Sequence, residues 1–363
     1  MPGQKEMLDQ LKRGKVFLPP LSFRFLKSQP NVAGSLFDAL IEVSWDKNRV
    51  KFAVECKSLS TPKAFQEGVN ALKLSALPKD YRPILLLPFL NNQQLEILER
   101  EGISGIDLCG NGIVIVPGIF SVFRSGQKNC FPSSALIKNI YRKNSSMVGR
   151  VFFSRPCYGS VNEIWSEVNR RNILVAYWNK DPMGLSTVSK SLKGLEDDLI
   201  IERKENICLL QADKLLEKLS ENYAPPKIRK RVQLKISEGG EAVREVLKRL
   251  SKPLGLPLVA AGTSSVGQYA VMPRGEVLSV YCPSLERLLN RLPGNPSDRF
   301  PDLELIETDD ETVYFDAREQ DGFWWASPVQ VYLELMTGDR RDRETAEQIK
   351  SFLISPQQPS KSS

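Results

Sequence analysis

Apolar and polar positions in the N-terminal part of the chain predict a mixed succession of strands and helices. Residues 4–14 place Leu8 and Leu11 on one side of a short amphipathic helix. The segment 35–57 has two apolar runs around a polar turn at 45–49, which predicts a β-hairpin. The further predicted elements are a helix at 63–74, a fully buried strand at 83–88, a helix at 92–101 and a strand at 113–116. This alternation is typical of an α/β domain.

Local signals mark two boundaries within this domain. Thr61 and Pro62 are residue types preferred at the N-cap and at the first position of a helix. Gly110 and Asn111 predict a turn with positive φ. Asp107 stands at a strand end just before that turn, and the sequence leaves open whether its role is structural or lies near an active site.

A helical segment and a second tight hairpin follow. We expect one helix over 161–178 and a shorter one over 186–195, with Val188, Leu192 and Leu195 facing inward. Strands at 199–204 and 207–210 flank a two-residue turn, and a helix at 213–223 leads away from them. Beyond it, helices and short strands alternate less regularly, which favours an α+β arrangement.

These patterns divide the chain into four parts. We predict an α/β domain over 1–145, a helix-and-hairpin domain over 146–224 and an α+β domain over 225–355. The remaining residues 356–363 have the composition of a disordered tail. The fold class predicted is therefore multi-domain α/β.

Composition narrows the protein class. The chain has 363 residues with 41% hydrophobic and 26% charged positions, as expected for two or three soluble globular domains. It contains no apolar run of roughly 18 residues, the length needed to cross a membrane, and no apolar signal core at the N-terminus. We therefore expect no membrane association and a cytoplasmic location.

Net charge and the residue types present limit the partners and the catalytic groups that the chain can have. The net charge of +7 fits a phosphate-bearing partner, and a basic run at 227–231 and an acidic stretch at 302–321 suggest a basic side and an acidic side. Histidine is absent and none of the six cysteines forms a C-x-x-C pair, so we expect no zinc site and no histidine-based catalysis. The cysteines are expected to be reduced and packed in cores. Carboxylates, lysine and a hard metal remain as catalytic groups.

One end of the first hairpin collects such groups. Asp38 opens the first apolar run, and Glu55 and Lys57 close the second. In a strand Glu55 and Lys57 point to the same face, while Cys56 points to the other. Two carboxylates can hold Mg²⁺, and a nearby lysine can orient or activate a water molecule. The alternative is a surface strand that carries an exposed ion pair.

The order of Asp38, hairpin, Glu55-x-Lys57 and a helix with Gln66 resembles the PD-(D/E)XK restriction-endonuclease superfamily, although Phe37 stands where proline usually precedes the aspartate. The resemblance implies that Asp38 and Glu55 ligate Mg²⁺, that Lys57 assists the attacking water, and that Gln66 belongs to the site. It also suggests that Glu6 of the first helix adds to the metal site. Such folds also occur as inactive scaffolds, so catalysis stays open.

The segment around the second hairpin resembles winged helix-turn-helix DNA-binding proteins. The resemblance makes 186–195 the recognition helix and the hairpin its wing. The implied contacts to duplex DNA are Ser186, Thr187, Ser189, Lys190 and Lys193 on the helix and Arg203 and Lys204 on the wing. Lys227, Arg229, Lys230 and Arg231 would grip the backbone beside it, unless they only form a solvated strand edge.

Two further motifs resemble the AbiEi family of antitoxins and transcription regulators: EGISGIDLCGN at 101–111 and ASPVQVYLEL at 326–335, with Arg343, Glu344 and Ala346. The resemblance implies a nucleotidyltransferase-like C-terminal domain. Gly262-Thr263-Ser264 fits the first element of its active site, but the strand 277–282 carries no acid, so we expect that domain to be inactive.

These observations support three functions. The first is a DNA-binding regulator of the AbiEi antitoxin type with a nuclease-fold domain. The second is a Mg²⁺-dependent DNA endonuclease of a phage-defence or mobile-element system that uses Asp38, Glu55 and Lys57. The third is an inactive protein-interaction scaffold. The expected partners are double-stranded DNA, a protein toxin or defence-system component, and a second copy of the chain.

Overall fold

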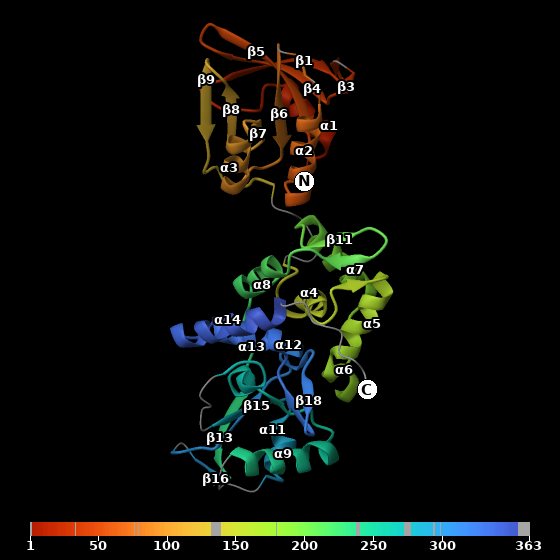
Figure 1. The fold of residues 1–363 in the computed structure, drawn as a ribbon, viewed down its shortest axis with the longest axis vertical. Helices are drawn as coiled ribbons and strands as arrows, with labels where there is room; N and C mark the ends of the chain where they lie inside the picture. Colours follow the sequence, from red (N-terminus) through yellow and green to blue (C-terminus); the bar gives the residue numbers. More distant parts are fainter. Residues whose placement is uncertain are drawn as a thin grey trace. The chain divides into compact units, whose positions relative to one another are not determined.

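The computed structural model contains two compact units, Met1–Lys138 and Asn139–Ser363, which are treated separately (Figure 1). It describes residues 2–32, 34–75, 77–78, 80–131, 139–178, 180–236, 240–271, 277–292, 295–297 and 299–354. Both units are mixed α/β, in agreement with the predicted fold class. The tail predicted at 356–363 lies outside the described residues. Among the helices of the described ranges, none has the combination of length and apolar character that a membrane crossing requires.

In the described part of unit 1 a seven-stranded sheet has the order β1-β4-β5-β6-β7-β8-β9. Its centre is parallel, from β5 through β6 to β7, and both flanks are antiparallel. The bounds are β1 Ser22–Ser28, β4 Ala39–Trp45, β5 Asn48–Cys56, β6 Tyr81–Leu87, β7 Ser104–Asp107, β8 Gly112–Val116 and β9 Phe120–Arg124, beside the short pair β2 Asn31–Val32 and β3 Ser35–Leu36. The predicted hairpin is β4–β5, which turns at Asp46 and Lys47.

Helices cover both faces of this sheet. Helix α1 (Gln4–Lys12) packs Met7 and Leu11 on one face, while α2 (Pro62–Leu74) and α3 (Asn92–Glu101) pack on the other. Strand β6 is buried on both sides, as its continuous apolar sequence predicted. Thr61 caps α2 by accepting a hydrogen bond from the Ala64 N–H at 3.3 Å, with Pro62 at the first helical position.

The Gly110 turn is confirmed, with φ of 95°, and the structure assigns Asp107 a structural role. Its buried carboxylate accepts hydrogen bonds from the N–H groups of Leu90, Cys109 and Asn111 and from the Asn111 side chain, at 2.8–2.9 Å. Asp107 therefore joins the β6–α3 loop to the β7–β8 turn.

The first part of unit 2 is helical with a small sheet. The described helices are α4 Ser146–Arg150, α5 Val161–Arg171, α6 Ile173–Trp178, α7 Leu185–Asp197 and α8 Ala212–Glu221. Strands β10 (Cys157–Tyr158), β11 (Ile201–Arg203) and β12 (Ile207–Leu209) form a sheet of order β10-β12-β11. The predicted hairpin is thus present as β11–β12.

The prediction of one helix over 161–178 is wrong, because the backbone leaves the helical conformation at Asn172. Its φ and ψ are −86° and 99°, and its backbone bridges to Phe315. The Asn172 side chain donates to Glu311 Oε2 at 2.6 Å. Tertiary hydrogen bonds therefore divide the segment into α5 and α6, which the local apolar pattern did not reveal.

The second part of unit 2 is built on a sheet of order β16-β13-β17-β15-β14-β19-β18 within the described residues. Its strands are β13 Lys230–Lys235, β14 Val259–Ala260, β15 Leu278–Cys282, β16 Asn295–Pro296, β17 Leu303–Glu307, β18 Arg318–Gln320 and β19 Phe323–Trp325. Its helices are α9 Gly240–Leu254, α10 Gly262–Ser265, α11 Leu285–Leu289, α12 Glu311–Tyr314, α13 Pro328–Met336 and α14 Arg340–Ile354. One apolar core continues from α4–α8 into α13 and α14, so the two parts pack as one body.

The prediction that the basic run at 227–231 and the acidic stretch at 302–321 lie on different sides of the protein is wrong. Strand β13 pairs with β17, so the basic run lies directly beside acidic residues. Arg229 contacts Asp309 at 2.5 Å and Arg231 contacts Glu304 at 3.4 Å. Strand pairing between distant segments brings the opposite charges together.

The expectation that the cysteines are reduced is wrong for Cys157 and Cys208, which form a disulfide. They face each other across β10 and β12, with their Cα atoms 4.2 Å apart. Because the two cysteines are 51 residues apart in the sequence, the local pattern does not reveal that they face each other. Cys56 and Cys282 are buried free thiols, as predicted, whereas Cys130 is free but exposed.

We expect replacement of Cys157 by serine to lower the free energy of unfolding of unit 2 by about 2–4 kcal/mol, because the cross-link restricts the unfolded chain. Urea denaturation without reductant measures the change. The exposed thiol variant Cys130→Ser is the control and should unfold like the wild type. Identical midpoints for Cys157→Ser and the unreduced wild type would contradict the stabilising role of the disulfide.

Candidate functional site at the end of the β4–β5 hairpin

Asp38 lies one residue before β4, at the open end of the hairpin. Its backbone N–H donates to the Val54 carbonyl at 3.0 Å. Its side-chain Oδ2 accepts a hydrogen bond from the Cys56 N–H at 2.7 Å. These contacts hold the Asp38 carboxylate beside the Glu55-Cys56-Lys57 segment.

Glu55 and Lys57 contact each other on one face of the sheet. Nζ of Lys57 lies 3.0 Å from Oε1 of Glu55, and both side chains are partly buried. Cys56 is buried on the opposite face, where its Sγ lies 3.9 Å from Sδ of Met7. Helix α2 approaches the Lys57 stem at Gly68, where an added Cβ would lie 3.4 Å from Lys57 Cγ. The strand alternation and α2 together position the Glu55–Lys57 pair.

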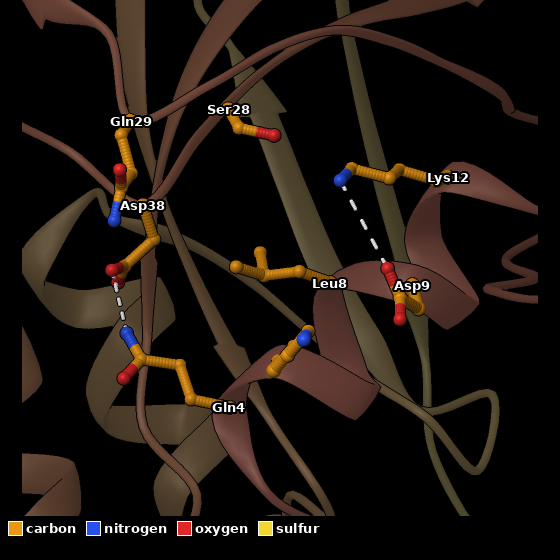
Figure 2. A pocket seen from close by; sticks show the side chains of 8 residues that line it. Gln4, Leu8, Asp9, Lys12, Ser28, Gln29 and Asp38 are labelled. Carbon is orange, nitrogen blue, oxygen red and sulfur yellow. Dashed lines mark hydrogen bonds and ion pairs between the residues drawn. The ribbon is translucent and has the colours of Figure 1, made fainter.

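Helix α1 adds a residue that the sequence interpretation missed. Nε2 of Gln4 donates to Oδ1 of Asp38 at 2.5 Å, as Figure 2 shows. Glu6, suggested for this position, is exposed. The available signal was helical spacing, because Gln4 precedes the buried Met7 by three residues and therefore lies on the same side of α1.

The electrostatics of Asp38 reflect this partly enclosed position. Burial raises the pKa of Asp38 above its ordinary value, while the Cys56 N–H, the Lys57 charge and the Gln4 amide oppose that increase. Because the folded-state pKa is raised, the contribution of Asp38 to stability is complete at low pH and is lost as the pH rises through that value.

Gln66 does not join this group of contacts. It is exposed on α2, and its side-chain amide donates to Oδ1 of Asn70 at 3.0 Å. The contacts at the hairpin end therefore form two neighbouring groups: Asp38 with Gln4 and the Cys56 N–H, and Glu55 with Lys57.

The donor set suits a hard divalent cation bound largely through water. Each Asp38 oxygen accepts one hydrogen bond from the protein, and Glu55 contributes a second carboxylate. Magnesium commonly uses one or two protein carboxylates and retains several waters. Within the described residues no group of three or more histidine, cysteine or acidic side chains forms a metal site. Asp38 and Glu55 are the carboxylates that could hold Mg²⁺ in this water-rich mode.

The predicted DNA-contacting residues of α7 lie opposite its buried face. Val188, Leu192 and Leu195 are buried, and Thr187 is partly exposed. The exposed positions among them are Ser186, Ser189, Lys190 and Lys193. Helix α7 thus presents a polar face with two lysines.

The other predicted cations are exposed but largely paired. Arg203 lies 4.0 Å from Glu196, and Lys204 forms an ion pair with Glu202. Arg229 and Arg231 have the acidic partners described above. Lys230, the first residue of β13, and Lys227, three residues before it, are exposed. Fewer positive charges are therefore available to phosphate than the sequence suggested.

Comparisons with known proteins identify no family for this chain. No protein-family model and no curated protein matches the chain. A solved structure described as a repair endonuclease from Pyrococcus abyssi aligns with 19% identity and a TM-score of 0.21. The alignment covers 30% of this chain and 47% of that one, so the chain spans about half the length of the structure it matches. A TM-score of this size does not establish a shared fold.

Proposed function

We propose that this chain acts on DNA and that its N-terminal unit hydrolyses phosphodiester bonds with Mg²⁺. The observation that carries the proposal is the hydrogen bond from the Cys56 N–H to Asp38. It holds the Asp38 carboxylate at the backbone of Cys56, the residue between Glu55 and Lys57, whose side chains lie 3.0 Å apart. Two acids that hold a metal ion and a lysine near the attacking water are groups that can support metal-assisted hydrolysis.

Each residue has a distinct part in this proposal. Asp38 and Glu55 would hold Mg²⁺, which would polarise the phosphate and lower the pKa of a bound water. Lys57 donates hydrogen bonds to the attacking water or to a phosphate oxygen, and Glu55 keeps its ammonium group in place at 3.0 Å. Gln4 and the Cys56 N–H fix the orientation of the Asp38 carboxylate.

We further propose that the segment from α4 to α8 is a winged helix that binds duplex DNA. Supporting this, α7 leads directly into the β11–β12 hairpin, and β10 completes a three-stranded sheet on β12. The polar face of α7 suits phosphate and base-edge contacts. The ion pairs of Arg203 and Lys204 make α7, rather than the hairpin, the main contact.

For the C-terminal sheet we propose a nucleotidyltransferase-like domain without transferase activity. Strand β15 lacks an acidic residue, and its Ser279 hydroxyl donates to Oε2 of Glu304 at 2.8 Å. Arg231 also contacts Glu304. This carboxylate is thus occupied by protein groups, which argues against two-metal chemistry there.

A second candidate function is a regulator of the AbiEi antitoxin type that binds DNA without cutting it. The specific observation in its favour is that the hairpin-end groups already satisfy one another, with Lys57 on Glu55 and Gln4 on Asp38. In that case its partners are duplex DNA and a protein toxin, and the hairpin end supports the fold.

Plasmid cleavage distinguishes these functions. With Mg²⁺, we expect the wild type to nick or linearise plasmid DNA, and Glu55→Ala and Lys57→Ala each to lower the rate by about 10²-fold or more. The matched control is Glu42→Ala, since Glu42 is a glutamate of the same hairpin that pairs with Arg24 at 2.8 Å. Its rate should remain that of the wild type.

The other outcomes are informative. A gel shift without cleavage supports the regulator and rejects hydrolysis. Equal loss of cleavage in Glu42→Ala and Glu55→Ala would point to damage to the fold rather than to the site. Absence of DNA affinity at low salt, where phosphate contacts are strongest, rejects both proposals and leaves a protein-interaction scaffold.

A further inference from the structure

A pocket of about 400 Å³ opens beside the hairpin end, on the side of α1 (Figure 2). Asp38 forms part of its wall, so the pocket shares this carboxylate with the proposed hydrolytic site. The opposite wall is α1, and the end of β1 with the following Gln29 completes it. Whatever occupies this pocket lies next to the Asp38 carboxylate.

The lining combines charged, polar and apolar groups. Positive charge comes from Lys5 and Lys12, and an equal negative charge comes from Asp9, which lies near Lys12, and from Asp38. Hydrogen-bonding groups come from Gln4, Ser28 and Gln29, and Leu8 contributes an apolar surface. Lys12 also lies 5.2 Å from the centre of the Phe25 ring and 3.9 Å from Asp9, which limits its range of positions. Lys5 is exposed.

This combination matches the parts of a nucleotide. Ammonium groups bind phosphate, amide and hydroxyl groups bind sugar and base edges, and an apolar side chain packs against a base or sugar. The volume is at the lower end of the range for small-ligand sites, which suits one nucleotide and excludes a helical duplex from entering.

We propose that this pocket binds one nucleotide of a single-stranded nucleic-acid segment, with Lys5 and Lys12 contacting its phosphate. The inference rests on the proposed hydrolytic function and specifies its substrate. In this arrangement an unpaired segment is held beside Asp38, one of the two proposed metal ligands.

The test is binding of fluorescent oligonucleotides to the full chain in Ca²⁺, measured by anisotropy. The probes are an unstructured oligo-dT strand and a blunt-ended hairpin duplex. The pocket variant is Lys5→Ala with Lys12→Ala. The matched control is Lys47→Ala with Arg49→Ala, which removes the same charge from exposed positions at the far turn of the β4–β5 hairpin.

We expect the pocket variant to bind oligo-dT at least about tenfold more weakly, with a salt slope reduced by about 1.4 for two lost phosphate contacts on a single strand. The control variant and the duplex probe should show little change. The proposal is overturned if both variants weaken oligo-dT binding equally, if the pocket variant weakens duplex binding as much, or if the wild type does not bind oligo-dT.

A separate readout distinguishes this proposal from the hydrolytic one. Glu55→Ala should retain oligo-dT binding while it loses cleavage in Mg²⁺. Binding that depends on Lys5 and Lys12 in a wild type that never cleaves would reject hydrolysis and leave the pocket assignment standing. Cleavage that depends on Glu55 but is unaffected by the pocket variant would reject the pocket assignment alone.

Discussion

Replacement of Asp107 by alanine is expected to lower the free energy of unfolding of unit 1 by about 4 kcal/mol or more. The buried carboxylate accepts four hydrogen bonds, and three of the donors are backbone N–H groups of Leu90, Cys109 and Asn111. Each buried donor left without a partner costs about 1–3 kcal/mol. Hydrogen exchange of the β6 and β7 amides in the full chain measures the loss.

The variant Asp107→Asn sharpens this prediction because it preserves the volume of the side chain. Each Asp107 oxygen accepts two hydrogen bonds, so an amide nitrogen at either position would face two donors. We expect the asparagine variant to be nearly as unstable as the alanine variant. Asp80→Ala, at an exposed position, is the control. A fully stable Asp107→Asn protein would show that shape, rather than charge, holds the loops together.

Features encoded within a few neighbouring residues were predictable from the sequence. The β4–β5 hairpin follows from strand alternation around a polar turn, and the start of α2 follows from Thr61 and Pro62. The alternation of side chains along β5 also predicted correctly that Cys56 lies on the face of the sheet opposite to Glu55 and Lys57. These features depend on local backbone geometry, which one segment is enough to specify.

Features that depend on how distant segments meet were not predictable. The contact of Gln4 with Asp38 depends on how α1 packs against the hairpin, and the sequence interpretation suggested Glu6 instead. The Cys157–Cys208 disulfide requires the register of β10 on β12. The neutralisation of Arg229 by Asp309 follows from the pairing of β13 with β17. A single sequence contains no direct signal for any of these pairings.

The ASPVQVYLEL motif shows how a recognisable pattern can have a structural basis. Ser327 caps α13, with Pro328 at its first position. Gln330 and Glu334, one turn apart on α13, face a polar cluster inside unit 2. Glu334 accepts hydrogen bonds from Gly262 N–H, Gln330 Nε2 and Tyr281 O–H. The motif therefore connects α13 to β15 and to the start of α10.

Arg150 of α4 completes this cluster and links the helical part of unit 2 to the sheet part. Its Nη1 donates to Oε1 of Gln330 at 2.9 Å and to the Thr312 carbonyl at 3.2 Å. Burial lowers the pKa of Arg150 to about 10, so it remains cationic at neutral pH. Burial raises the pKa of Glu334, and the positive charge of Arg150 opposes that increase.

We expect Arg150→Met to lower the free energy of unfolding of unit 2 by about 2–4 kcal/mol at neutral pH, because the buried oxygens of Thr312 and Gln330 lose their donor and Glu334 loses a nearby positive charge. The loss should be smaller near pH 5. Without Arg150 the folded-state pKa of Glu334 rises further, so protonated Glu334 is tolerated at low pH, and stability is lost as the pH rises through that pKa.

The matched experiment compares urea denaturation of Arg150→Met, Glu334→Gln and the double variant at pH 5 and pH 8. The double variant has no carboxylate at position 334. It should therefore lack the additional loss of unfolding free energy that Arg150→Met shows at pH 8 compared with pH 5. The coupling energy between the two substitutions should then be favourable. Arg155→Met is the control for loss of a cation, because Arg155 pairs with Glu163 at the surface. Arg150→Met could lower the stability equally at both pH values, with the same loss in the double variant. That result would show that Arg150 acts through packing and its two hydrogen bonds. A pH-dependent loss that the double variant relieves would instead identify its charge as the link between α4 and the α13 motif.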